Sequence, residues 1–210
     1  NIFKTDPNNI TSVWIADAKS NILITTDKAQ PIKAKLSDRP WYKTALAKKD
    51  VSTIEPYKNI TTGEMIMSIV TPIYKNGNSD LIGFSGVNIS IENLSKMVEK
   101  YKLGKTGFYI LTTNGGKIIH HPDKKLVDKS IQDSNMSDNV IKAIQSKTAG
   151  KITYSAMNKT NHGNISLIGN TGWTVTTGLP ENEFNSCYSQ LLTTILSIFI
   201  VALILLILVT

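Results

Sequence analysis

One short segment of the sequence brings together side chains that are suited to binding an anion. Residues 37–45 read SDRPWYKTA, and Arg39 is the single arginine of the sequence; every other basic residue counted in the composition is lysine. An arginine guanidinium is a planar fork of donors that matches a carboxylate with two parallel hydrogen bonds, whereas a lysine ammonium acts as a point charge. We therefore interpret Arg39 as a candidate carboxylate-binding residue.

Aromatic residues accompany this arginine. Trp41 adds an indole N–H, and Tyr42 and Tyr57 add hydroxyl groups. Such side chains can line an apolar pocket and still keep a polar atom for a ligand. A packing role is the alternative, in which Arg39 stacks on Trp41 at the start of a helix and the aromatic rings belong to the core. The residues alone leave both interpretations open.

The other reactive side chains form no catalytic or metal-binding pattern. The sequence lacks the common nucleophile, nucleotide-binding and zinc-protease motifs. His120 and His121 are adjacent, so on a strand they would point to opposite faces and could not bind one metal together. We expect His162 to lie in a turn beside Gly163 without a partner, and Cys187 lies directly before an apolar segment. We therefore expect no enzyme activity, no metal and no cofactor.

The C-terminal segment is apolar enough to cross a membrane. No charged residue occurs from 184 to 210, and residues 191–209 read LLTTILSIFIVALILLILV. At about 1.5 Å per residue, a helix of this length spans roughly the 30 Å hydrocarbon core of a bilayer. We predict a transmembrane helix over 188–210. The sequence begins without Met and stops directly after this segment, so we expect it to be part of a longer chain.

Composition argues against a nucleic-acid partner despite the positive charge. The 210 residues carry a formal net charge of +7, but the lysines occur singly or in pairs, with no basic run of five. Lysines spread in this way are typical of a solvated surface. A hydrophobic content of 41% indicates a globular chain, and one cysteine excludes an internal disulfide framework.

The elements that must position the candidate residues are mostly short strands. Alternating apolar residues and turn signals predict hairpins over 12–27 and 107–123. The helix and strands expected after the first hairpin cover 38–49, 52–59, 64–74 and 81–90. Those expected after the second cover 137–148, 150–158, 164–170 and 172–180, with a turn at 159–163.

The two series have the same order, which predicts an internal duplication of an α+β module. Between them, residues 91–105 carry apolar side chains at the spacing of an amphipathic helix, which would connect the modules. We expect a first module over 1–100, a second over 101–187 and the membrane helix over 188–210.

This organisation, with RPWY in the first module and GFYILTTNGGKIIHHP in the second, resembles the double Cache sensor domain of bacterial methyl-accepting chemotaxis proteins. The similarity covers nearly all of residues 10–185. The resemblance implies two tandem PAS-like modules, each an antiparallel sheet with flanking helices, outside the cytoplasmic membrane. It also implies a homodimer at the cell membrane and cytoplasmic signalling partners that are reached through a part not in this sequence.

In the family that this sequence resembles, an Arg, a Trp and a Tyr of the distal module hold the carboxylate of an amino acid. Arg39, Trp41 and Tyr42 match these residues. A second Tyr, matched by Tyr57, and two acidic residues surround the ammonium group. The resemblance therefore implies a small-molecule ligand in the first module.

The acidic part of that pattern is altered in this sequence. Asn59 and Asn88 stand where acids are expected, and Ala34 stands where an aromatic residue is expected. Each lost charge-assisted hydrogen bond costs about 1.5–3 kcal/mol. Two ligand classes stay open: an amino acid, held more weakly or by another acid such as Asp17 or Asp27, and an organic acid that lacks an amine.

We therefore expect the ligand-sensing domain of a transmembrane chemoreceptor. The helix expected in the second module contains no Arg, Trp or Tyr, so we expect that module to transmit the signal. A sensor histidine kinase or a cyclic-dinucleotide enzyme is the alternative for the output, and a ligand-free scaffold is the alternative for the domain.

Overall fold

The computed structural model describes residues 9–75 and 80–209. The chain divides into two compact units, Asn1–Lys100 and Tyr101–Thr210. Each unit has one antiparallel sheet with flanking helices, so the α+β class predicted from the sequence is confirmed.

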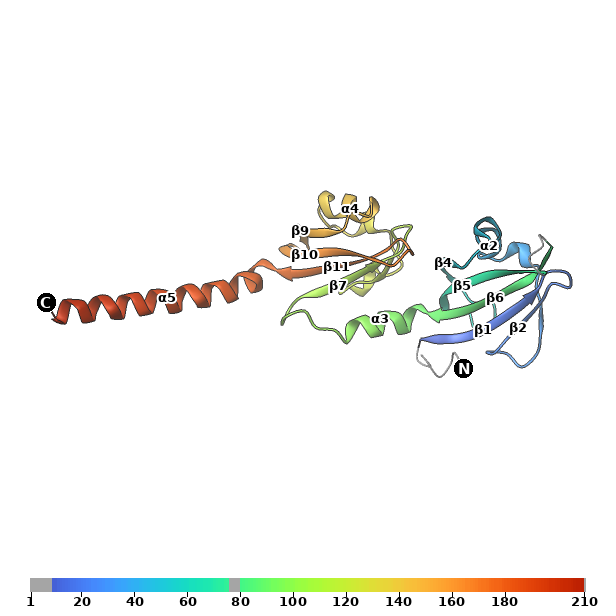
Figure 1. Ribbon diagram of the computed structural model, residues 1–210, viewed down its shortest axis with the longest axis horizontal. Coiled ribbons are helices and arrows are strands. Elements are labelled where there is room, and N and C mark those ends of the chain that lie inside the picture. Colours follow the sequence, from blue (N-terminus) through green and yellow to red (C-terminus); the bar gives the residue numbers. More distant parts are fainter. Residues whose placement is uncertain (1–8, 76–79, 210) are drawn as a thin grey trace. The chain divides into compact units, whose positions relative to one another are not determined.

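The first unit is built on a six-stranded sheet with the order β3-β2-β1-β6-β5-β4. Helix α2 lies over one face of this sheet, and α3 follows β6 (Figure 1). The elements are β1 (Ile10–Asp17), β2 (Ile22–Thr25), β3 (Ile32–Lys33), η1 (Leu36–Asp38), α2 (Tyr42–Lys48), β4 (Ser52–Lys58), β5 (Met65–Tyr74), β6 (Leu81–Ser90) and α3 (Ile91–Glu99).

Alternation along the strands decides which face of this sheet α2 covers. On β1, Trp14 and Ala16 are buried, whereas Ile15 and Asp17 point to the opposite face and are exposed. The buried side chains pack against Trp41 and Ala45 of the segment that carries α2. This core sits directly beside the candidate site.

The helix predicted over 38–49 is interrupted, and this part of the prediction is wrong. A 3₁₀ turn ends at Asp38, Arg39 is extended with φ −81° and ψ 139°, and α2 begins only at Tyr42. The cause is Pro40, because a proline disfavours the helical conformation in the residue before it. Arg39 therefore lies in the bend between two helical turns and not on a helix.

The second unit has a five-stranded sheet with the order β8-β7-β11-β10-β9. In both sheets the last strand of the unit, β6 or β11, lies beside the first strand of the hairpin. The elements are β7 (Phe108–Thr112), β8 (Ile118–His120), η2 (Lys124–Leu126), η3 (Ile131–Asp133), α4 (Asp138–Gln145), β9 (Gly150–Ala156), β10 (Lys159–Ile168), β11 (Trp173–Pro180) and α5 (Glu181–Val209). Buried residues of α4, among them Val140 and Ile144, pack on this sheet.

The turn predicted at 159–163 is wrong, because these residues belong to strand β10. The chain reverses at Met157 and Asn158, whose φ angles of 52° and 59° are typical of a two-residue hairpin turn. Gly163 is a glycine for a different reason: an added Cβ would lie 1.8 Å from the backbone oxygen of Thr177. The expectation for His162 is also wrong, since its ring stacks on Phe184 with 4.2 Å between centroids.

The adjacent histidines are buried near the end of β8. Strand β8 ends at His120, and His121 follows it. The Nδ1 atom of His121 accepts a hydrogen bond of 2.9 Å from the backbone N–H of Asp123. Burial lowers the pKa of both imidazoles. Among the residues that the structure describes, no group of three or more His, Cys, Asp or Glu side chains could hold a metal ion.

The C-terminal helix α5 starts earlier than predicted, at Glu181 and directly after β11. Residues Glu181–Val201 form a helix long and apolar enough to cross a membrane, judged by length and composition. Its described apolar side chains, such as Leu196 and Phe199, are exposed.

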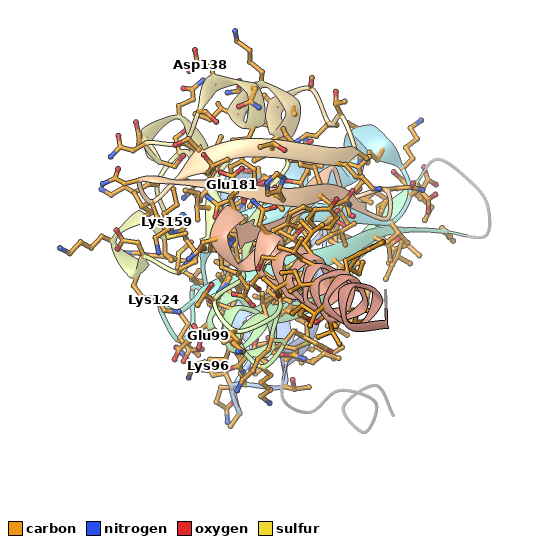
Figure 2. The ribbon with its side chains drawn as sticks, turned by 90° about the vertical axis from the view of Figure 1, so that its left-hand side faces the viewer. Lys96, Glu99, Lys124, Asp138, Lys159 and Glu181 are labelled. Carbon is orange, nitrogen blue, oxygen red and sulfur yellow. The ribbon has the colours of Figure 1, made fainter. Side chains whose placement is uncertain are left out.

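Several charged side chains of the second unit point into solvent. Figure 2 shows Lys124, Asp138 and Lys159 projecting outward from the second unit, and all three are exposed. This distribution agrees with the solvated lysine surface that the composition indicates.

Candidate ligand-binding site

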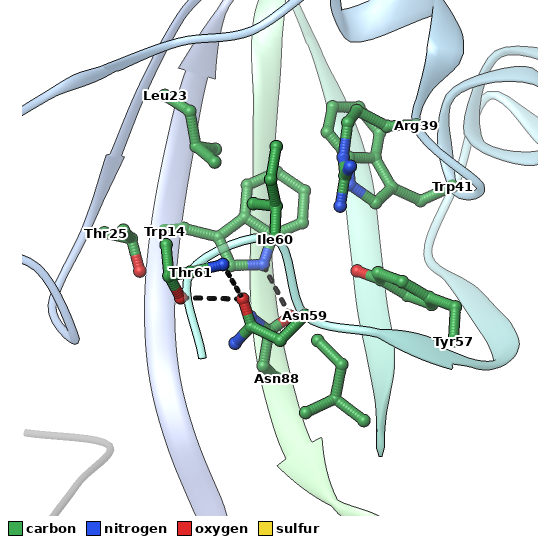
Figure 3. A pocket seen from close by; sticks show the side chains of 11 residues that line it. Trp14, Leu23, Thr25, Arg39, Trp41, Tyr57, Asn59, Ile60, Thr61 and Asn88 are labelled. Carbon is green, nitrogen blue, oxygen red and sulfur yellow. Dashed lines mark hydrogen bonds between the residues drawn. The ribbon is translucent and has the colours of Figure 1, made fainter. Parts of the chain in front are cut away.

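The first unit encloses a small cavity between its sheet, the bend that carries Arg39 and the turn after β4. Its volume is about 20 Å³, which is room for about one water molecule. The cavity is lined by Trp14, Leu23, Thr25, Arg39, Trp41, Tyr57, Asn59, Ile60, Thr61, Ile66 and Asn88. In Figure 3, Arg39 and Tyr57 lie on one side of the cavity, and Thr25 and Thr61 lie on the opposite side.

Arg39 supplies one unused donor beside this cavity. Its Nε atom is buried and has no hydrogen-bond partner among the described residues. No acidic side chain of the described residues forms an ion pair with it. A buried charged donor without an acceptor is costly and rare in native proteins. The buried Nε atom of Arg39 is therefore a donor that lacks an acceptor within the described residues.

One aromatic ring of the cavity wall contacts the arginine. The guanidinium carbon of Arg39 lies 5.9 Å from the centroid of the Tyr57 ring, which is the distance of a cation–π contact. The Trp41 ring packs instead on Trp14 and Phe84, with centroid distances of 4.7 and 4.9 Å. The partner in the aromatic contact is thus Tyr57, whereas the packing alternative expected Trp41.

Asn88 is fixed at the floor of the cavity by three hydrogen bonds. Its Oδ1 atom accepts from the indole N–H of Trp14 at 2.9 Å and from the Ser68 hydroxyl at 2.6 Å. Its Nδ2 atom donates to the Ser12 hydroxyl at 2.8 Å. Two donors fill the two acceptor positions of an amide oxygen. Asn88 therefore shapes the wall and offers no free acceptor to a ligand.

The same network sets the hydrogen-bonding role of Tyr57. Its hydroxyl lies 2.6 Å from the Ser68 hydroxyl. Because Ser68 donates its one hydrogen to Asn88, the hydrogen between the two hydroxyls must come from Tyr57. The Tyr57 oxygen is then left as an acceptor. Burial raises the pKa of Tyr57, and the hydrogen bond with Ser68 and the charge of Arg39 offset part of the increase, so the phenol is neutral at physiological pH.

The turn after β4 carries the other predicted asparagine. The Asn59 Nδ2 atom donates to Oδ2 of Asp27 at 3.2 Å, and the backbone N–H of Thr61 donates to Oδ1 of Asn59 at 2.9 Å. The Thr61 hydroxyl lies 2.6 Å from the same Asp27 oxygen, and the Thr25 hydroxyl donates to the other one. Asp27 is thus the acid that lies directly behind these cavity-lining residues.

The second acid weighed from the sequence lies elsewhere. Asp17 accepts hydrogen bonds from the backbone N–H and the hydroxyl of Ser20 in an exposed turn, both at 2.6 Å. It does not line the cavity.

Five of the six predicted ligand-binding residues line one cavity: Arg39, Trp41, Tyr57, Asn59 and Asn88. Tyr42 does not line it. Its ring packs on Phe84 at 5.2 Å between centroids, because it is the first residue of α2 and that face points to the core.

Several lining residues were not predicted from the sequence. Trp14 is the largest of them, and the alternation of β1 was a signal for its burial but not for its contact with Asn88. Ile60 and Thr61 lie in a turn, where no periodic pattern marks a binding residue. The unpredicted set is Trp14, Leu23, Thr25, Ile60, Thr61 and Ile66.

Comparisons with known proteins agree with this architecture. The family model of the double Cache type, described as Cache domain, matches residues 1–186. The methyl-accepting chemotaxis protein McpG of Pseudomonas putida is 28% identical over 122 residues, which are 58% of this chain and 19% of that receptor. The chain thus spans about a fifth of the length of this relative.

Solved structures show the same fold. An extracellular domain assigned to a histidine kinase, mmHK1S-Z3, has a TM-score of 0.73 at 19% identity and covers 91% of this chain and 80% of that domain. The ligand-binding domain of the Pseudomonas aeruginosa amino acid chemoreceptor PctB, in complex with L-Arg, has a TM-score of 0.66 at 18% identity, with 88% and 76% covered. From its family match over residues 1–186 we conclude that this chain belongs to the Cache domain family, and that its relatives include methyl-accepting chemotaxis proteins.

Proposed function

We propose that this chain is the extracytoplasmic ligand-sensing part of a transmembrane chemoreceptor and that its first unit binds a small ligand with a carboxylate. One observation carries the proposal: the guanidinium of Arg39 faces a cavity with a buried Nε that has no partner. A ligand carboxylate would supply the missing acceptor. The relationship to methyl-accepting chemotaxis proteins supports the receptor role.

An amino acid is the favoured ligand class within this proposal. The Tyr57 oxygen is left as an acceptor on the Arg39 side, and the carboxylate of Asp27 lies behind the opposite wall. An organic acid without an amine is the second candidate, because both asparagines that face the cavity are neutral. PctB, a structural neighbour, is an amino acid chemoreceptor.

Ligand entry requires movement of the wall, since the cavity holds about one water molecule. The turn after β4 is the part suited to move. Ile60 in this turn is 47% exposed although it lines the cavity. We infer that Ile60 and Thr61 swing outward to admit the ligand, which then stabilises the closed arrangement.

The rest of the chain would carry the signal. We propose two tandem PAS-like modules, with the first distal and ligand-binding and the second proximal to the membrane, and with α5 as the transmembrane helix. The shared strand order of the two sheets supports this division. We further propose a homodimer that reaches cytoplasmic partners through a part of the protein outside this sequence. The likeness to mmHK1S-Z3 keeps a histidine kinase output as the second candidate.

Ligand-induced thermal stabilisation of the 210-residue chain in detergent tests the proposal. The panel holds the proteinogenic amino acids and, for each, the matched carboxylate without the amine. A ligand at 100 times its Kd adds about 2.7 kcal/mol to the free energy of unfolding, and Arg39→Ala should remove this stabilisation. Lys43→Ala, an exposed cation on α2, is the control and should keep it. Silence across the panel, or a response that Arg39→Ala leaves intact, would favour a scaffold.

A further inference from the structure

Three side chains that line the cavity on the side away from Arg39 converge on one carboxylate. Asn59 Nδ2 lies 3.2 Å from Asp27 Oδ2, Thr61 Oγ1 lies 2.6 Å from the same oxygen, and Thr25 bonds the second oxygen. Asp27 does not itself line the cavity. It stands directly behind three residues that do.

The charge of Asp27 is not neutralised by the protein. Within residues 9–75 and 80–209, no lysine, arginine or histidine forms an ion pair with it. Partial burial raises the pKa of Asp27, but hydrogen bonds from Thr25, Thr61 and Asn59 outweigh this effect, and the net pKa is lowered. The carboxylate is therefore ionised at neutral pH and held by neutral donors alone.

The amide of Asn59 can adopt only one orientation in this cluster. Its Oδ1 atom accepts from the backbone N–H of Thr61, and its Nδ2 atom faces the Asp27 carboxylate. The reversed amide would set nitrogen against the Thr61 N–H and oxygen against the carboxylate. Both contacts would be repulsive, so Oδ1 is assigned to the Thr61 side.

The Thr61 hydroxyl faces two acceptor oxygens but can donate a hydrogen to only one of them. The Thr61 hydroxyl lies 2.6 Å from Asp27 Oδ2 and 2.7 Å from Asn59 Oδ1, and it has a single hydrogen to donate. The charged carboxylate is the stronger acceptor, so the Thr61 and Asn59 oxygens approach closely with no hydrogen between them. Both atoms belong to cavity-lining residues. A ligand group rich in N–H donors would satisfy both oxygens, whereas a second carboxylate or an apolar group would not.

We propose that Asp27 is a specificity-determining residue which, through Asn59 and Thr61, makes this side of the cavity a site for a ligand ammonium group and thereby selects amino acids over amine-free acids. The inference rests on the proposed function, because it assumes that Arg39 binds the carboxylate of the same ligand. In this inference Asp27 is a positioning residue, and the side-chain oxygens of Asn59 and Thr61 are the atoms that touch the ligand.

The test compares two probe pairs that differ only in the amine: L-alanine with propionate, and L-leucine with 4-methylpentanoate. Binding to the 210-residue chain in detergent is measured by calorimetry for wild type, Asp27→Asn and Asp17→Asn. Asp27→Asn should lower the affinity for the amino acids roughly ten- to a hundred-fold and leave the affinity for the amine-free acids unchanged or higher. Asp17→Asn removes an equal charge from an exposed turn outside the cavity and should change neither.

Several results would overturn the inference. Equal losses for both members of a pair would mean that Asp27 acts through structure alone, and unchanged amino acid affinity would mean that it does not act on the ligand. Binding of amine-free acids alone by the wild type would also contradict it, while the Arg39 proposal would stand. If the wild type bound none of the four probes, or if Arg39→Ala bound them as tightly as the wild type, both this inference and the proposed function would be overturned.

A second variant guards against misfolding of Asp27→Asn. Thr61→Val replaces a hydroxyl by a methyl group of similar size and keeps the acid. It should also reduce the affinity ratio between L-leucine and 4-methylpentanoate, by a smaller factor than Asp27→Asn. An unchanged ratio in Thr61→Val would contradict the role given to that oxygen.

Discussion

At the scale of residues, some polar atoms of the cavity wall have all their hydrogen-bond partners inside the protein, and others lack a partner. The Oδ1 atom of Asn88 has both acceptor positions filled inside the protein, by Trp14 and Ser68. Arg39 has a buried donor in excess, and the pair Asn59 and Thr61 has acceptors in excess. A zwitterion has the complementary excess at each end, which is why we propose an amino acid rather than a simple acid as the ligand.

The lowered pKa of Asp27 predicts how the stability of the folded chain changes at acid pH. Its pKa is lower in the folded chain than the ordinary aspartate value, so the folded state binds protons less readily than the unfolded state. The resulting stabilisation is fully present above the unfolded pKa of about 3.9 and is lost as pH falls through the lowered folded pKa. Wild type should therefore lose more unfolding free energy than Asp27→Asn between pH 5 and about pH 2. Parallel curves in denaturant titrations over this range would contradict this prediction.

Other carboxylates with lowered pKa values do not affect the comparison of wild type with Asp27→Asn. Hydrogen bonds lower the pKa of Asp17 and of Glu183 as well. Both groups are present in wild type and in Asp27→Asn, so their contributions cancel in the difference between the two curves.

The sequence predicted the residues of the site better than their roles. Arg39 and Trp41 could be found because a single arginine beside aromatic residues is a local pattern. The helical break at Pro40 was also local and could have been predicted from the restriction on the residue before a proline. The saturation of the Asn88 Oδ1 atom could not, because Trp14 and Ser68, which donate to it, lie on two separate strands.

At the scale of elements, the floor of the cavity depends on one close approach between neighbouring strands. Trp14 on β1 pairs with Gly86 on β6. A Cβ at residue 86 would lie 2.3 Å from Cζ2 of Trp14. The glycine thus lets the indole lie against β6 and reach Asn88 with its N–H. Gly163 on β10 likewise permits a close approach, in this case to the backbone oxygen of Thr177 on β11.

Gly86→Ala should therefore disturb both stability and binding. The added methyl group pushes the Trp14 ring away, and overpacking of this kind costs about 1–3 kcal/mol. Ligand affinity should fall as well, because the indole and Asn88 both line the cavity. Denaturant unfolding and calorimetry provide the two measurements. Ser85→Ala, one residue earlier and on the opposite sheet face, is the control and should leave binding unchanged; an effect equal to that of Gly86→Ala would argue against the contact.

At the scale of the whole molecule, the long apolar helix α5 is the feature that supports the proposed receptor role at a membrane. The apolar run 191–209, within the membrane helix predicted over 188–210, has no charge, whereas α5 begins with Glu181 and Glu183. Glu183 accepts hydrogen bonds from Thr106 and from the backbone N–H of Lys105. These bonds attach the start of α5 to the loop before β7 within the second unit, and the apolar part follows beyond them.

Membrane insertion of α5 can be tested directly. The chain expressed in bacteria should stay with the membrane fraction after alkaline carbonate extraction. Ile198→Lys should reduce this fraction, since a lysine at the centre of a span costs about 2.5–3.5 kcal/mol of insertion free energy. Ser186→Lys, before the apolar segment, should have no effect. Release of the wild-type chain by carbonate would contradict the membrane role of α5.

The central claim is that the fork of Arg39 binds a ligand carboxylate, and Arg39→Lys tests it most directly because it keeps the charge and removes the planar pair of donors. Calorimetry with L-alanine, L-leucine and their amine-free counterparts should show that every ligand bound by the wild type binds at least ten-fold more weakly to Arg39→Lys, with the unliganded stability nearly unchanged. Equal affinity in wild type and Arg39→Lys would show that the site needs only a positive charge, or that the ligand binds elsewhere, and would contradict the claim.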